Sequence, residues 1–207
     1  DYMLELWFRA DTTALEFPVT IFSAGDNMLS LNVGKLDYEQ GDVSIDKEVM
    51  YLIANGRRYI IPNGANCLGG AWHHISLNVL NQMQGVSTLY IDGVAMRQFD
   101  AGIIPGLQAE SLILGARSSK DAANMYVYDQ PLRGCFDEVR YWKGTYSAQV
   151  IRNNRYHRLQ DAETGLLGYY PFERNTLDEG NQPIVEADLS DHSSLASPAA
   201  RVFSLSG

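Results

Sequence analysis

Two pairs of acidic residues are possible catalytic centres by residue type. One pair lacks the required spacing, and the other lacks the required surroundings. Hydrolysis of a glycosidic bond with retention of configuration needs two carboxylates about 5 Å apart. Asp137 and Glu138 are adjacent, and because successive strand residues point to opposite faces, they are predicted not to form such a pair. Asp46 and Glu48 have the right offset, but they fall in the acidic stretch 37–48, which is predicted to be a solvated loop. No catalytic residue is therefore assigned, and the chain is predicted not to be an enzyme.

The adjacent histidines His73 and His74 are a second possible centre. Neighbours on a strand diverge, so the two rings are not expected to hold one metal ion together. His73 shares a face with Ile75 and Leu77, which predicts a core histidine whose hydrogen bonds are satisfied. His74 falls on the opposite face with Trp72, where it could line a groove, although the sequence supplies it with no orienting partner.

The two cysteines, Cys67 and Cys135, stand too far apart in the sequence to match the spacing of a metal site. Two states stay open for them. They form a disulfide in an oxidising compartment, or they are buried free thiols.

Aromatic side chains are the best candidates for binding, because carbohydrate sites combine exposed rings with nearby polar groups. Most of the tyrosines are expected to pack between strands. Tyr126 and Tyr128 share one face, and a polar stretch at 118–124 precedes them. The predicted ligand-binding residues are Trp72, His74, Tyr126, Tyr128, Asp121 and Asn124.

Short alternating segments separated by Gly, Asn and Asp predict the all-β sandwich that must position these residues. Asn55-Gly56 and Asp92-Gly93 each stand between two apolar runs and predict two-residue hairpins. Ser147 is a good N-cap for one short connecting helix near 147–156. The predicted strands are 4–9, 19–23, 28–33, 50–54, 57–61, 71–80, 86–91, 94–99, 111–115, 125–128, 133–142 and 166–172.

Length and charge exclude several classes of protein. The 207 residues are enough to bury a sizeable core without disulfides or metals. The formal net charge is −9, whereas a protein that binds duplex nucleic acid normally presents a basic face. The apolar runs are far too short to insert into a membrane.

After residue 173 aromatic residues become rare, which indicates that 174–207 is a polar linker or the start of a following module.

Six segments, in order, resemble the laminin-G-like, concanavalin A-like modules of large secreted and cell-surface proteins, many of them bacterial. The resemblance implies an antiparallel two-sheet jelly-roll sandwich over residues 1–173. It also implies a recognition module of an extracellular or cell-surface protein, which binds glycan or protein partners or neighbouring domains of a longer chain. A structural repeat that docks onto neighbouring domains or subunits, and a jelly-roll glycoside hydrolase, are the alternatives. The segments are LELWFRAD (4–11), AWHHISLNV (71–79), STLYIDGVAMRQF (87–99), SLILGARS (111–118), RGCFDEVRYWKGTYSAQVI (133–151) and GLLGYYPFE (165–173).

The same resemblance implies a calcium site built partly by Asp137. In such modules the Phe-Asp-Glu-Val strand commonly holds calcium together with an Asp- and Ser-rich stretch. Here the only matching stretch is 188–194, which follows the last predicted strand of the domain and would serve the next module. The alternative is that Asp137 accepts hydrogen bonds from backbone amides while Glu138 faces solvent beside Arg140.

Overall fold

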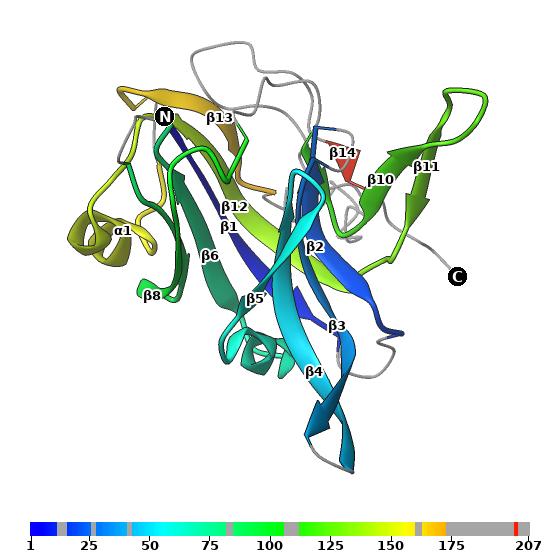
Figure 1. Ribbon diagram of the computed structural model, residues 1–207. Helices are drawn as coiled ribbons and strands as arrows, with labels where there is room; N and C mark the ends of the chain where they lie inside the picture. Colours follow the sequence, from blue (N-terminus) through cyan, green and yellow to red (C-terminus); the bar gives the residue numbers. More distant parts are fainter. Residues whose placement is uncertain are drawn as a thin grey trace, which may run out of the picture.

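The computed structural model describes residues 1–11, 16–25, 28–40, 43–81, 85–105, 112–159, 163–172 and 201–202. Of residues 36–40, 43–47 and 201–202 it describes the backbone alone. Two large sheets lie face to face, as Figure 1 shows.

The first sheet, sheet A, has the strand order β13-β12-β1-β6-β7-β8, and all of its neighbouring strands are antiparallel. Its strands are β1 (Tyr2–Ala10), β6 (His73–Val79), β7 (Ser87–Ile91), β8 (Val94–Phe99), β12 (Gly134–Lys143) and β13 (Leu166–Tyr170). The second sheet, sheet B, has the order β14-β9-β2-β3-β4-β5 and is antiparallel except between β14 and β9. Its strands are β2 (Val19–Ala24), β3 (Leu29–Gln40), β4 (Val43–Ala54), β5 (Arg57–Ile61), β9 (Leu112–Leu114) and β14 (Arg201–Val202).

The core lies between the two sheets and follows the period-two alternation of the sequence. Leu4, Leu6 and Phe8 of β1 are buried against sheet B, where Phe22 and Leu52 are among their counterparts. Alternate residues of β1 point to the outer face of sheet A instead. The predicted jelly-roll sandwich is confirmed. The outer face of sheet A does not contribute to the core between the sheets, so other segments of the chain can pack on it.

Both predicted two-residue hairpins form. Asn55 and Gly56 have φ of 49° and 74° between β4 and β5, and Asp92 and Gly93 have φ of 53° and 77° between β7 and β8. Positive φ at both central residues is the geometry that favours Asn-Gly and Asp-Gly pairs in such turns.

The predicted connecting helix is α1 (Ala148–Asn154), the one α-helix among the described residues. The Ser147 hydroxyl caps it by accepting a hydrogen bond from the amide of Val150 at 3.3 Å. Its buried residue Ile151 packs on the outer face of sheet A in a second apolar cluster with Met3 and Trp142. The helix therefore covers part of that face.

Three parts of the fold differ from the sequence prediction. The acidic stretch 37–48 was predicted to be a loop, but the backbone of 37–40 and 43–48 belongs to the β3–β4 hairpin, where Lys35 pairs with Glu48. Asp46 therefore lies in β4, opposite Asp37. Residues 117–120 belong to strand β10 (Arg117–Lys120), which forms a separate hairpin with β11 (Tyr126–Asp129). A 3-10 helix, η1 (Gly64–Leu68), follows β5.

Candidate functional site

A β-bulge in β12 changes which side chains reach the outer face of sheet A. Glu5 of β1 pairs with Arg140, but Trp7 pairs with Asp137, so two residues of β12 stand opposite one residue of β1. Glu138 takes up the extra residue with φ of 50°, a left-handed conformation that is rare outside glycine. The prediction that Asp137 and Glu138 point to opposite faces is therefore wrong, because the bulge interrupts the alternation.

Asp137 and Glu138 both line a pocket of about 340 Å³ on that face, beside α1. The floor comes from β1 and β12, and the side wall comes from the segment 155–158 that follows the helix. We call this cavity the Trp72 pocket. It is lined by Trp7, Trp72, Asp137, Glu138, Arg140, Arg155, Tyr156, His157 and Arg158.

Three aromatic rings give the Trp72 pocket its apolar surface. Trp72 is 40% exposed and Tyr156 is 70% exposed, whereas Trp7 is half-buried. The Trp7 indole donates a hydrogen bond to the Arg155 carbonyl at 2.9 Å, and its ring centroid lies 5.3 Å from that of Tyr156. Trp72 was predicted as a binding residue, and the structure places it beside charged side chains in this pocket, while its role in binding stays a prediction.

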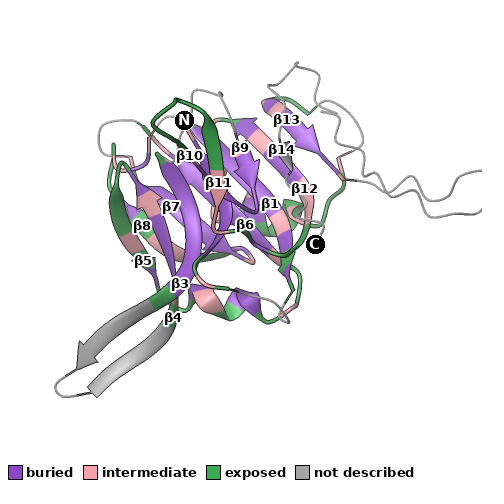
Figure 2. Cartoon of the chain, turned by 90° about the vertical axis from the view of Figure 1, so that its right-hand side faces the viewer, coloured by how far each residue is buried: buried purple, intermediate pink, exposed green. Residues whose placement is uncertain are grey.

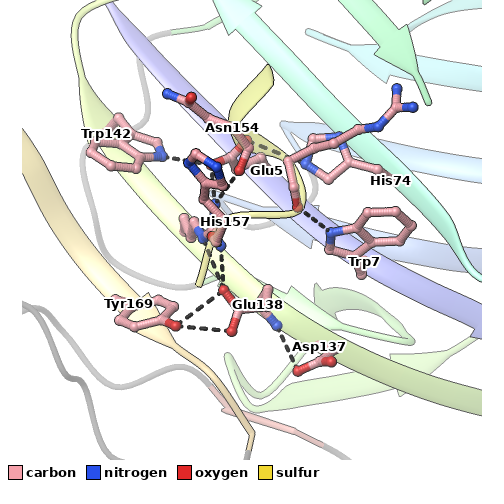
Figure 3. A network of polar contacts seen from close by, with 11 residues as sticks. Glu5, Trp7, His74, Asp137, Glu138, Trp142, Asn154, His157 and Tyr169 are labelled. Carbon is pink, nitrogen blue, oxygen red and sulfur yellow. Dashed lines mark hydrogen bonds and ion pairs between the residues drawn. The ribbon is translucent and has the colours of Figure 1, made fainter. Parts of the chain in front are cut away.

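Glu138 is held in place by two partners (Figure 3). The Tyr169 hydroxyl lies 2.9 and 3.0 Å from its two oxygens, and the Arg140 guanidinium forms an ion pair with Oε2. The alternative to the calcium site had this carboxylate facing solvent, but its side chain is only 14% exposed. These contacts hold the Glu138 carboxylate in one position on the pocket wall.

A buried charged network supports the Trp72 pocket from below. Glu5 accepts hydrogen bonds from Trp142 Nε1 at 2.9 Å and from Arg140 Nη1 at 3.4 Å, and its Oε2 lies 3.2 Å from His74 Nε2. Burial alone would raise the pKa of Glu5, but His74, Arg140 and Trp142 outweigh it and hold that pKa below its ordinary value. Arg140 also donates to the carbonyl of His157, which ties the sheet to the segment after α1.

His74 is therefore not a residue of an open groove. Its side chain is 1% exposed, and the orienting partner that the sequence did not reveal is Glu5, on the neighbouring strand. His73 does have its hydrogen bond satisfied, as predicted, since Nδ1 lies 2.8 Å from Asp92 Oδ2. However, it lies at the rim of the core with 21% of its side chain exposed.

The other predicted binding residues lie in the β10–β11 hairpin, which Figure 1 shows on the opposite side of the molecule from α1. Tyr126 and Tyr128 are stacked, with centroids 6.4 Å apart. Asp121 accepts hydrogen bonds from the amides of Ala123 and Met125 and so shapes the turn, while Asn124 has φ of 60°. The structure thus divides the predicted residues between two places.

The predicted calcium site is described only on the side of Asp137. Its Oδ1 accepts a hydrogen bond from the Glu138 amide at 3.0 Å, as the alternative interpretation expected. Within the described ranges, no group of three or more His, Cys, Asp or Glu residues could hold a metal ion. The stretch 188–194 lies outside those ranges, as does most of 174–207, so the calcium site and the domain boundary stay predictions.

The cysteines are free and differ in their surroundings. Cys67 is buried and donates a hydrogen bond to the Gly64 carbonyl at 2.9 Å, and burial raises its pKa to about 12. Cys135 is exposed on β12, where Arg9 Nη2 lies 3.6 Å from its sulfur.

A family model described as the concanavalin A-like lectin/glucanases superfamily (Laminin_G_3) matches residues 1–152. The chain belongs to this family. The match confirms the resemblance seen in the sequence and gives the protein a lectin-like fold. No curated protein matches the chain in sequence. No helix among the described residues is both long and apolar enough to cross a membrane.

Solved structures share this fold at low sequence identity. A Bacteroides ovatus protein provisionally named as a carbohydrate binding protein is 21% identical, with a TM-score of 0.60 over 86% of this chain. The match spans 47% of that protein, so the chain covers about half its length. Domain 4 of AbnA, an extracellular arabinanase from Geobacillus stearothermophilus, is 17% identical over 73% of this chain and 65% of that domain, with a TM-score of 0.42. The binding domain of botulinum neurotoxin serotype D is 9% identical over 82% of this chain and 41% of its own, also with a TM-score of 0.42.

Proposed function

We propose that this chain is a non-catalytic carbohydrate-binding module and that the Trp72 pocket is its binding site. The observation that carries the proposal is the meeting of exposed aromatic rings with fixed polar groups in one cavity. Sugar rings have apolar faces that stack on indole and phenol rings, and hydroxyl edges that need hydrogen-bonding partners. The lectin-like fold supports this function but does not locate the site, because a fold hosts many functions.

The pocket is suited to hold part of a sugar chain. Trp72 and Tyr156 are both exposed to solvent, so a sugar can reach them from outside the pocket. The bulge adds a second carboxylate to the polar edge, and Tyr169 and Arg140 keep that carboxylate in one position. Fixed groups lose little conformational freedom on binding, which favours affinity.

The same proposal places the chain in a secreted or surface-exposed protein, where it attaches a larger molecule to glycans. The Bacteroides ovatus neighbour is named for carbohydrate binding and is about twice as long as the matched region, which is consistent with a module of a larger protein.

A second candidate function is protein docking through the β10–β11 hairpin. Figure 2 shows most of this hairpin as exposed, and three consecutive apolar residues at its tip share that exposure. Met125 is 65% exposed, and Tyr126 and Val127 are each 43% exposed. Exposed apolar groups in one place are typical of contact surfaces.

Alanine substitutions separate the two sites. A glycan array followed by calorimetry on the best ligand should show binding by the unchanged chain and at least about a tenfold loss, equal to 1.4 kcal/mol, in Trp72→Ala and in Tyr156→Ala. Tyr126→Ala is the matched control, since it removes a ring about as accessible as Trp72 from the other side of the molecule. Loss of binding in Tyr126→Ala but in neither pocket variant would overturn this assignment and return the site to the hairpin.

A further inference from the structure

Two arginine side chains lie against the exposed rings of the Trp72 pocket. The Arg9 guanidinium carbon is 5.4 Å from the centroid of Trp72, and that of Arg155 is 4.7 Å from the centroid of Tyr156. In the described parts of the chain, neither guanidinium forms an ion pair with a carboxylate. Arg9 contacts the sulfur of Cys135, and Arg155 donates to the Asp92 carbonyl and the Tyr156 hydroxyl.

The carboxylates around the pocket already have partners. Glu138 is bound by Arg140 and Tyr169, and Glu5 is bound by Arg140 and His74. Asp137 accepts the amide of Glu138. The Nε of Arg155, which lines the cavity, is buried with no hydrogen-bond partner. Arg9 and Arg155 are therefore positive groups at the pocket that pair with no carboxylate of the described residues, although the whole chain carries a net charge of −9.

We propose that the ligand of the Trp72 pocket is an acidic sugar, one whose ring carries a carboxylate. This inference rests on the proposed carbohydrate-binding function and names the class of ligand. The planar fork of a guanidinium matches a carboxylate with two parallel hydrogen bonds, and Trp72 and Tyr156 supply stacking surfaces beside the two forks. A sugar that stacks on either ring brings a ring carboxylate close to Arg9 or Arg155.

The negative net charge of the whole chain bears on how an acidic sugar would be recognised. A chain of net charge −9 repels a polyanion at long range, so non-specific attraction does not explain binding of an acidic glycan. Recognition then depends on the short-range contacts of the pocket. Ion pairs formed there are weakened by added salt, but less than pairs fully open to solvent.

The test uses matched pairs of sugars that differ only in charge. Oligosaccharides of galacturonate, glucuronate, mannuronate and guluronate are compared with their carboxyl-reduced counterparts by calorimetry on the full chain. We expect at least one acidic member to bind about tenfold or more tightly than its reduced counterpart. Arg9→Gln should remove most of that preference, and Arg9→Lys should remove part of it, because lysine keeps the charge but loses the fork.

Arg57→Gln is the control, because Arg57 is an exposed arginine on β5 and its substitution changes the net charge equally. An equal loss of preference in Arg57→Gln and Arg9→Gln would show that only overall charge matters and would overturn the inference. Equal binding of acidic and reduced sugars, still dependent on Trp72, would overturn it while leaving the carbohydrate-binding function intact. Absence of any sugar binding would overturn both this inference and the proposed carbohydrate-binding function. Circular dichroism of each variant establishes that it is folded before binding is compared.

Discussion

Glu5 and Arg140 stand opposite each other on β1 and β12, and their side chains form a buried ion pair with 3.4 Å between Oε1 and Nη1. The pair lies immediately before the bulge, and Arg140 also binds Glu138 within it. One guanidinium therefore joins the regular part of the sheet to the irregular part that lines the Trp72 pocket. Both side chains are at most 4% exposed, so water cannot serve as a substitute partner for either charge.

Removal of the Glu5 charge should destabilise the fold strongly. In Glu5→Gln, Arg140 and His74 lose the negative charge that pairs with them, and an NH2 group replaces one of the two acceptor oxygens. Breaking a buried pair by removing one charged partner costs about 3–5 kcal/mol. Urea unfolding measures the loss. Asp100→Asn, on an exposed aspartate, should change the free energy of unfolding by less than about 0.5 kcal/mol. A Glu5→Gln protein as stable as this control would contradict the buried network.

The same carboxylate should make the protein sensitive to acid. Because the pKa of Glu5 is lower in the folded protein than the ordinary value of 4.5, its contribution to stability is full above about pH 4.5. That contribution falls as the pH drops toward the lowered pKa, where the folded form also takes up the proton. The stability difference between the unchanged chain and Glu5→Gln should therefore narrow below pH 4.5. Thermal melts of both proteins from pH 7 to pH 3 measure it, and a constant difference would refute the prediction.

The left-handed backbone at Glu138 should be detectable by comparing the stabilities of two variants at this position. Both Glu138→Ala and Glu138→Gly lose the contacts with Arg140 and Tyr169. Glycine, however, accepts a φ of 50° without the strain of about 1–2 kcal/mol that other residues pay there. We therefore expect Glu138→Gly to unfold at higher denaturant concentration than Glu138→Ala. In a regular strand the order would be reversed, because glycine weakens strand interiors.

The two thiols should react at very different rates. Cys135 is exposed, whereas Cys67 is buried and its pKa is raised to about 12, so almost none of it is thiolate at neutral pH. A thiol-specific chromogenic reagent should label one cysteine per folded chain and two after denaturation. Cys135→Ser should abolish the fast reaction. Two slow thiols in the folded chain, or none after denaturation without reductant, would be at odds with the described structure.

Calcium binding stays a prediction that melting experiments can decide. A ligand that binds only the folded state at about 100 times its dissociation constant adds roughly 2.7 kcal/mol of stability. If Asp137 takes part, the melting temperature should rise with calcium and fall with a chelator, and Asp137→Asn should lose this response. A melting temperature of the unchanged chain that is the same with calcium and with chelator would end the prediction for this chain.

The sequence was sufficient to predict the sandwich because the fold depends on local rules that the chain obeys. The alternation of Leu4, Leu6 and Phe8, the turns at Asn55-Gly56 and Asp92-Gly93, and the cap at Ser147 were each confirmed. The assignment of 37–48 to a loop was wrong, because its charged composition concealed two paired strands.

The site was harder to predict, because it depends on an exception to alternation. Asp137 and Glu138 were predicted to lie on opposite faces of the sheet, because adjacent strand residues normally do. A one-residue bulge instead brings both side chains to the same pocket. The position of a bulge is set by the neighbouring strand, so no local pattern indicated it. The Glu5–His74 contact joins residues far apart in the chain, and a charged residue on the outer face of a strand is ordinarily taken as solvated. Trp72 was correctly singled out as exposed, whereas Tyr156 was counted as part of the helix.

All three tryptophans of the chain belong to one small region. Trp7 and Trp72 line the pocket, and Trp142 donates its indole hydrogen to Glu5 directly beneath it. Intrinsic fluorescence therefore reports on this region instead of averaging over the whole molecule. A sugar stacked on Trp72 should alter the emission of the exposed indole, whereas protonation of Glu5 should alter that of the buried one. Quenching by iodide, which reaches exposed rings first, can separate the two signals, so the native protein already contains its own optical probes for both ligand and acid.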